Sequence, residues 1–198
     1  MLDNTMPKTL REAVRIAAIL NLAYFGIEFA VALHIKSVSL FADSIDFLED
    51  SSVDFLILFA LGWSARTRAR IGMALAAVLL APAAATLWTA WHKFLLPVAP
   101  APLPLGLTGL GALAVNVTCA FALVRFREHS GGLSRAAFLS ARNDALVNIA
   151  IIATAGVTLF YHSAWPDLLV GLGIAALNAG AAHEVFTAAR RDHAEAEP

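Results

Sequence analysis

Residues 37–54 read SVSLFADSIDFLEDSSVD, a stretch in which acidic side chains recur within an otherwise apolar pattern. It contains five carboxylates: Asp43, Asp46, Glu49, Asp50 and Asp54. At 100° per residue, all of them except Glu49 share an arc of about 80°, so they would line one helix face over about 16 Å. Carboxylates this close together cannot all be ionised unless a cation or a proton lies among them. The pattern therefore predicts a cation site on one face of a helix.

The composition of the chain places this helix in a membrane. Of the 198 residues, 59% are hydrophobic and 15% are charged, whereas a soluble domain has about 25% charged residues. A helix needs roughly 20 mostly apolar residues to span a bilayer. Six stretches meet this length: 13–33, 38–63, 71–95, 103–123, 136–161 and 168–188. We therefore expect an all-α integral membrane protein with six transmembrane helices in one transmembrane domain over 1–198, followed by no soluble C-terminal domain.

The basic residues predict an orientation, because Lys and Arg gather on the cytoplasmic side of a membrane protein. Eleven lie before or at the start of the first span, after the last span, or in the connections on the same side: Lys8, Arg11, Arg15, Arg66, Arg68, Arg70, Arg125, Arg127, Arg135, Arg190 and Arg191. Only Lys36 and Lys93 lie on the other side. We expect both termini in the cytoplasm and a multi-pass location in the plasma membrane, the inner membrane of a bacterium. A net charge of −1 gives no reason to expect a nucleic-acid partner.

Ionisable groups inside spanning helices cost at least about 2.5–3.5 kcal/mol on insertion scales, so they usually face a cavity or a partner. In the fifth span, Ser140, Asp144 and Asn148 recur every four residues and would stack along one side. Arg142 and Asn143 point elsewhere on that helix. A simpler reading pairs Asp144 with Arg142. In the second span, the simpler interpretation is that the acids near its ends cap the helix or contact water.

Two further spans carry buried polar positions. Asn21 and Glu28 are seven residues apart in the first span and so share one face, and Asn116 lies in the fourth. For the asparagines, hydrogen bonding between helices and ligation of a cation are both open readings.

The donor types indicate which cation the acids would bind. Several carboxylates with hydroxyl and amide neighbours form an oxygen-rich site, which suits a hard or borderline divalent cation. Zinc usually recruits His or Cys, yet none of the six His residues falls deep within a predicted span. Oxygen donors alone leave zinc, cadmium, cobalt, manganese and iron open.

These motifs resemble the cation diffusion facilitator family, which comprises six-helix metal–proton antiporters. Residues 37–50, SVSLFADSIDFLED, resemble the second helix of that family, and the resemblance places its metal-binding pair on Asp46 and Asp50. Residues 137–148, AFLSARNDALVN, resemble the fifth helix, where Asp144 matches the second member of another such pair. The polar residues of the first and fourth spans, and Trp165-Pro-Asp at the start of the sixth, also resemble the family. The likeness extends over the whole membrane region with the same helix order.

Two departures from the family pattern bear on function. Ser140 stands where the family normally has His or Asp. The expected metal site therefore consists of three carboxylates and the Ser140 hydroxyl, which replaces the usual fourth ligand. Water, Asn143, Glu49 or a backbone carbonyl would then complete the ligand shell. Most members also carry a cytoplasmic domain after the sixth helix that supports dimerisation. Without it, we expect a homodimer formed through the transmembrane helices.

The resemblance implies metal/proton antiport, with efflux of a divalent cation from the cytoplasm by alternating access at this site. The expected partners are the metal ion, protons and the bilayer, and we expect no cofactor besides the transported metal. The expected accessory or pathway residues are Asp43, Glu49, Asp54, Glu28, Asn21, Asn116, Asn143 and Asn148. An acid-lined cation channel and a non-transporting metal sensor or scaffold are the alternatives. No catalytic constellation is present, so an enzyme is not expected.

Overall fold

The computed structural model describes the chain except for residues 1–7, 60–66, 68–69, 72–83, 125–131 and 196–198. Side chains are described over the same residues apart from 8–9, 132–141 and 181–195. Within these limits the protein is all-helical.

Five helices have defined bounds: α1 (Lys8–Ile35), α2 (Val38–Phe59), α4 (Pro102–Val124), α5 (Gly132–Phe160) and α6 (Trp165–Glu195). Between α2 and α4, the described residues 67, 70–71 and 84–95 are also helical. The described helical segments therefore follow the predicted order of six. The expected spans 13–33, 136–161 and 168–188 are shorter than α1, α5 and α6, because apolar composition marks the membrane-facing part of a helix whereas hydrogen bonding continues beyond it. Residues 60–63 of the expected span 38–63 and residues 72–83 of the expected span 71–95 fall outside the described residues.

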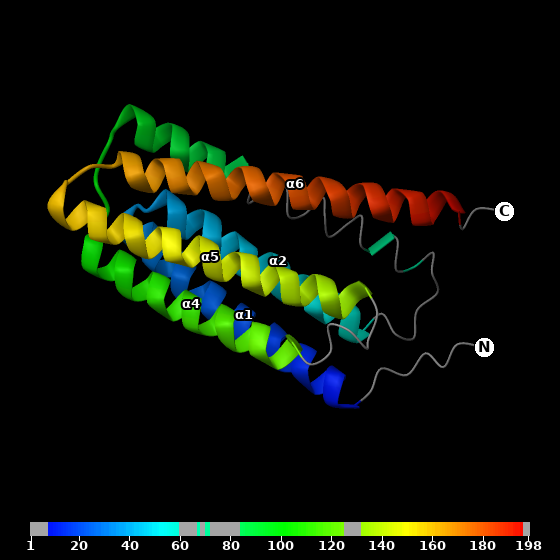
Figure 1. The fold of residues 1–198 in the computed structure, drawn as a ribbon. Coiled ribbons are helices and arrows are strands. Elements are labelled where there is room, and N and C mark those ends of the chain that lie inside the picture. The colour runs from blue at the N-terminus through cyan, green and yellow to red at the C-terminus, as the bar shows by residue number, and fades with distance from the viewer. Residues whose placement is uncertain (1–7, 60–66, 68–69, 72–83, 125–131, 196–198) are drawn as a thin grey trace.

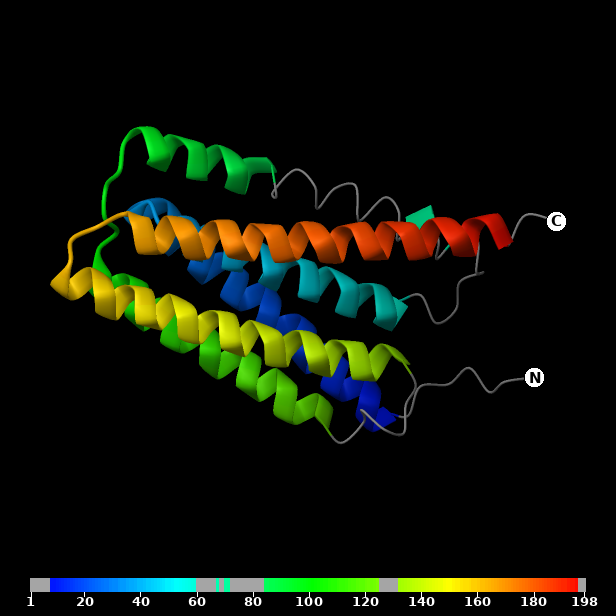
Figure 2. The same ribbon diagram turned by 45° about the horizontal axis from the view of Figure 1, so that its top comes forward.

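The helices pack side by side in one bundle (Figures 1 and 2). Among the described helices, α2 contacts α1, α5 and α6, and α4 contacts α1 and α5. Residues 84–95 lie beside α6 in both views. This arrangement places α2, the helix with the acidic stripe, in the interior of the bundle.

The connections 36–37, 96–101 and 161–164 lie at one end of the bundle, hereafter the turn end (Figure 1). The start of α1 and the end of α6 lie at the opposite end (Figures 1 and 2). Both ends of the described chain are thus on one side, as an even number of spans requires. Lys36 makes the turn from α1 to α2 with a left-handed backbone (φ 56°), a conformation common at helix C-termini.

Asp167, in the first turn of α6, fixes the start of α2. Its carboxylate accepts hydrogen bonds from the backbone N–H groups of Val38 (2.9 Å) and Ser39 (3.2 Å) and from the hydroxyls of Ser37 and Ser39, both at 2.6 Å. The ammonium of Lys93 forms an ion pair with the same carboxylate at 2.6 Å. We call this group the Asp167 clamp: it satisfies free N–H groups at the N-terminus of α2 and ties α2, α6 and residues 84–95 together.

A close approach of α6 to α2 leads to a first prediction. A Cβ atom at Gly171 would lie 2.7 Å from the backbone carbon of Val38 and 2.8 Å from the nitrogen of Ser39. Gly171→Ala should therefore push α6 away from the clamp and lower the free energy of unfolding by about 1–3 kcal/mol. Thermal unfolding in detergent measures the change. Gly173→Ala is the matched control, since a Cβ there meets nothing within 4 Å. Equal stability of the two variants would contradict the close-packing argument.

Candidate metal centre

The acids of α2 differ in how far the bundle covers them. Asp43 is fully buried and Asp54 is 5% exposed, whereas Asp46, Glu49 and Asp50 are half-buried. Because Asp43 lies in the interior without a hydrogen-bond donor, it does not act as a helix cap. The simpler interpretation, in which Asp43 caps the helix or contacts water, is therefore wrong. The stripe runs through the bundle and not along its lipid-facing surface.

Asp144 of α5 meets the stripe across the bundle. The carboxylate of Asp46 lies within electrostatic range of Asp144, Asp43, Asp50 and Glu49, and the interaction with Asp144 is the strongest of these. Asp144 is half-buried and lies on α5, which contacts α2 directly. Two sequence segments about 100 residues apart thus bring like charges together, an arrangement that favours a cation between them.

These carboxylates do not stand at ligating distance in the described conformation. Among the residues that the structure describes, no three His, Cys, Asp or Glu side chains are grouped closely enough to hold a metal ion. Asp46, Asp50 and Asp144 are therefore near one another but form no closed coordination shell. Ser140, the expected fourth position, lies on α5 among the residues whose side chains are not described.

The buried asparagines occupy the interior faces of three helices. Asn21 (3% exposed) accepts a weak hydrogen bond from the thiol of Cys119 at 3.7 Å, which links α1 to α4. Asn116 is also buried. Asn148 is fully buried, and its amide nitrogen donates to the carbonyl oxygen of Asp144 at 2.8 Å. The side-chain oxygen of Asn148 has no donor, so it is an uncommitted acceptor one turn from Asp144.

Asn143 does not belong to this interior set. Its side chain is exposed, and its oxygen accepts a hydrogen bond from the guanidinium of Arg142 at 3.3 Å. The expectation that Asn143 serves as an accessory residue of the site finds no support in this placement, because its helical position turns it away from the buried face. The neighbouring Arg142 is likewise exposed.

Sequence reasoning missed the Asp167 clamp. The sequence identifies Lys93 only as a basic residue on the outer side, and Asp167 only as part of the start of the sixth span. The signal for Asp167 was an acid just after Pro166 at a helix start, a position that favours negative charge. Nothing local predicted that its partner would be Lys93, 74 residues earlier.

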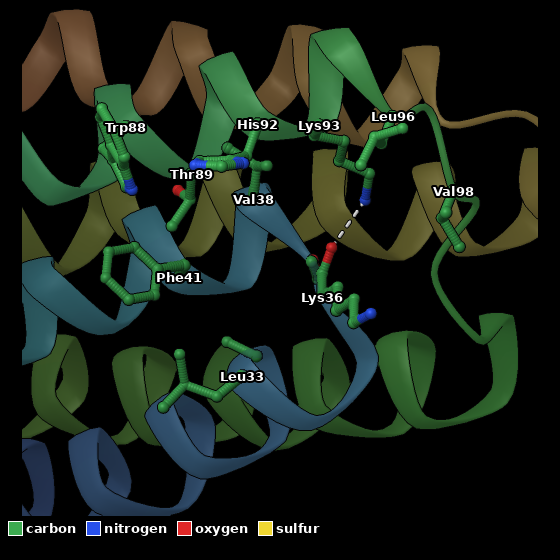
Figure 3. A pocket seen from close by; sticks show the side chains of 12 residues that line it. Leu33, Lys36, Val38, Phe41, Trp88, Thr89, His92, Lys93, Leu96 and Val98 are labelled. Atoms are coloured by element: carbon green, nitrogen blue, oxygen red, sulfur yellow. Dashed lines mark hydrogen bonds between the residues drawn. The ribbon is translucent and has the colours of Figure 1, made fainter.

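A separate cavity lies at the turn end, beside the clamp. Its volume is about 410 Å³, and it is lined by the end of α1, the start of α2 and residues between Trp88 and Val98. Its described lining contains no carboxylate. Figure 3 shows the hydrogen bond from Lys93 to the carbonyl of Lys36 at its edge. The cavity is therefore not the candidate metal centre.

The fold and the acids together define a class of protein. Three helices in the described part of the chain are long and apolar enough to cross a bilayer: Leu10–Ile35, Pro102–Val124 and Arg142–Phe160. An interior polar face of carboxylates and amides lies among them and on α2. These features define a multi-pass membrane domain with carboxylates and amides buried in its interior.

Comparison with known proteins identifies the family. Residues 14–192 match the cation efflux transmembrane domain, so the chain belongs to the cation efflux family. Members of this family are cation transporters rather than enzymes. No curated protein matches the chain.

Proposed function

We propose that the protein exchanges a divalent transition-metal ion for protons by alternating access at the carboxylates of α2 and α5. The observation that supports this most is the electrostatic coupling of Asp46 to Asp144 across the interior of the bundle. In the proposed cycle a metal ion from the cytoplasm displaces protons from Asp46, Asp50 and Asp144. The loaded site then opens to the other side, where protons return and release the metal.

The described separation of the acids suits this cycle. Three carboxylates near one another but not at ligating distance would repel when ionised, and a divalent cation would draw α2 and α5 together. Asn148 offers an uncommitted amide oxygen on the same face of α5, and Ser140 offers a hydroxyl. We propose that these oxygens, with water, complete the shell. Asp43, Asp54 and Glu49 then line the path along α2, and Asn21, Glu28 and Asn116 are accessory residues.

The substrates, location and oligomeric state that we propose are those expected from the amino-acid sequence. Zinc, cadmium, cobalt, manganese and iron are the candidate substrates. We propose an inner-membrane location with both termini in the cytoplasm, a homodimer formed through transmembrane helices, no catalytic activity, and no cofactor besides the transported ion.

Transport by purified protein in liposomes tests the proposal. A proton gradient imposed across the membrane should drive zinc, cadmium or manganese against its own gradient, with counter-movement of protons reported by an enclosed pH dye. A metal flux whose rate does not depend on the proton gradient would favour the acid-lined channel. Metal binding without flux would identify a sensor or scaffold.

The substitution at Ser140 gives a second prediction. Ser140→Asp should restore an anionic ligand and tighten metal binding by roughly tenfold, or about 1.4 kcal/mol, or change the preferred metal. Titration of the purified variant with each metal measures this, and proteoliposome flux shows whether transport persists. Ser140→Ala is the control, since serine is a weak ligand and its loss should change affinity little. Unchanged affinity and metal preference in Ser140→Asp would place this position outside the site.

A further inference from the structure

Glu28 of α1 and Asp43 of α2 form a second acidic pair with an unusual environment. Both side chains have no exposed surface. None of their four carboxyl oxygens has a hydrogen-bond donor. Asp167 is equally buried, yet its carboxylate accepts bonds from two backbone N–H groups, two hydroxyls and an ammonium. Buried carboxylates normally have such partners because desolvation penalises an uncompensated charge.

In the part of the chain that the structure describes, no basic side chain forms an ion pair with Glu28 or Asp43. The two carboxyl groups lie within hydrogen-bonding reach of each other across the α1–α2 interface. The titratable groups that act on them are Tyr24 on α1 and Asp46 and Asp50 on α2. The hydroxyl of Tyr24 already donates to the carbonyl oxygen of Thr108 on α4 at 2.6 Å. Among the described residues, the charged groups that act on the pair are therefore further acids.

We propose that Glu28 and Asp43 are a proton-binding site separate from the metal centre, in which one proton is shared between the two carboxyl groups. A proton converts a contact between two acceptors into a hydrogen bond and leaves the pair with one negative charge instead of two. A metal ion fits less well, because zinc sites take three or four protein ligands and the pair supplies only two ligating side chains.

The position of the pair suggests its use, and this step rests on the proposed antiport. Asp43 precedes Asp46 by three residues, so it lies about 4.5 Å nearer the turn end along the axis of α2. A proton that arrives from the turn end meets this pair before it meets the metal-binding acids. Loss of the shared proton would leave two facing anions that push α1 and α2 apart. The pair thus links proton occupancy to the packing of the two helices.

Infrared spectroscopy of purified, metal-free protein in lipid tests the shared proton. The starting protein carries Asp46→Asn, Asp50→Asn and Asp144→Asn, because these acids would themselves hold protons in the metal-free protein. At neutral pH it should show the carbonyl stretch of a protonated carboxylic acid. Adding either Glu28→Gln or Asp43→Asn should lower the intensity of that band by one carboxylic acid, because the new amide N–H donates to the remaining carboxylate and no proton is needed. Adding Glu12→Gln, at an exposed acid of α1, is the control and should leave the band unchanged. Absence of the band in the starting protein, or its persistence at full intensity after either amide substitution of the pair, would overturn the proposal.

A zinc-retention experiment shows whether the pair binds a proton or a metal ion. Protein carrying Asp46→Asn, Asp50→Asn and Asp144→Asn should retain no zinc after dialysis. Retained zinc that disappears when Glu28→Gln is added would overturn the proton site in favour of a second metal site. The infrared result does not depend on transport. A protein that fails to exchange metal for protons but shows the expected band pattern would refute the antiport alone, whereas antiport without the band would refute the pair alone.

Discussion

Replacing Asp167 with alanine is expected to lower the free energy of unfolding by about 3–5 kcal/mol, the usual cost of removing one partner from a buried ion pair. The ammonium of Lys93 is 5% exposed and would lose its only described ion-pair partner. The N–H groups of Val38 and Ser39 would lose their acceptor at the same time. Denaturation of the purified protein in detergent measures the loss.

A double-mutant comparison shows whether the ion pair is the cause. Lys93→Met together with Asp167→Ala removes both charges, so the double variant should be more stable than Asp167→Ala alone. Asp167→Asn keeps an acceptor oxygen for the first turn of α2 and should fall between wild type and Asp167→Ala. A loss below about 0.5 kcal/mol for Asp167→Ala would be typical of a surface substitution and would contradict the clamp.

Asp50→Ala and Asp144→Ala should each lower metal-dependent proton movement in proteoliposomes at least about 100-fold. Removing a residue that only supports a metal ligand costs about 10–100-fold in affinity or activity, and a ligand itself should cost more. The two residues lie on different helices, so equal losses in both would indicate one shared site. The pH change inside the liposomes after addition of metal is the measured quantity.

The exposed acid Glu12, on α1, provides the control for this pair of variants. Glu12→Ala removes a carboxylate away from the buried face and should transport at the wild-type rate. Full transport by both Asp50→Ala and Asp144→Ala would remove these residues from the site. Loss in Glu12→Ala as well would point to general misfolding instead of a lost ligand.

The periodicity of the acids predicted their common face because helix geometry is local. A 100° turn per residue is enough to place Asp43, Asp46, Asp50 and Asp54 on one side of α2. The same rule placed Asn21 and Glu28 together, and both are buried. Apolar composition likewise predicted the helix order, since spanning segments must satisfy their backbone internally.

What periodicity could not supply was the pairing of faces between helices. The contact of Glu28 with Asp43 and the ion pair of Lys93 with Asp167 depend on how α1, α2, α6 and residues 84–95 pack. That packing is set by shape and close approach, as at Gly171. Asn143 shows the same limit: its amide suggested an accessory ligand, but its angular position on α5 leaves it exposed, so its role stays a prediction.

Acids from α2 and α5 are proposed to bind one divalent cation, and isothermal titration of the purified protein tests this most directly. Titration with zinc, cadmium, cobalt, manganese and iron should show saturable binding of at least one metal to the wild type. Asp46→Ala, which removes an acid within electrostatic range of both Asp144 and Asp50, should weaken that binding at least about 100-fold, or about 2.7 kcal/mol. Equal affinity in the wild type and Asp46→Ala would contradict the claim.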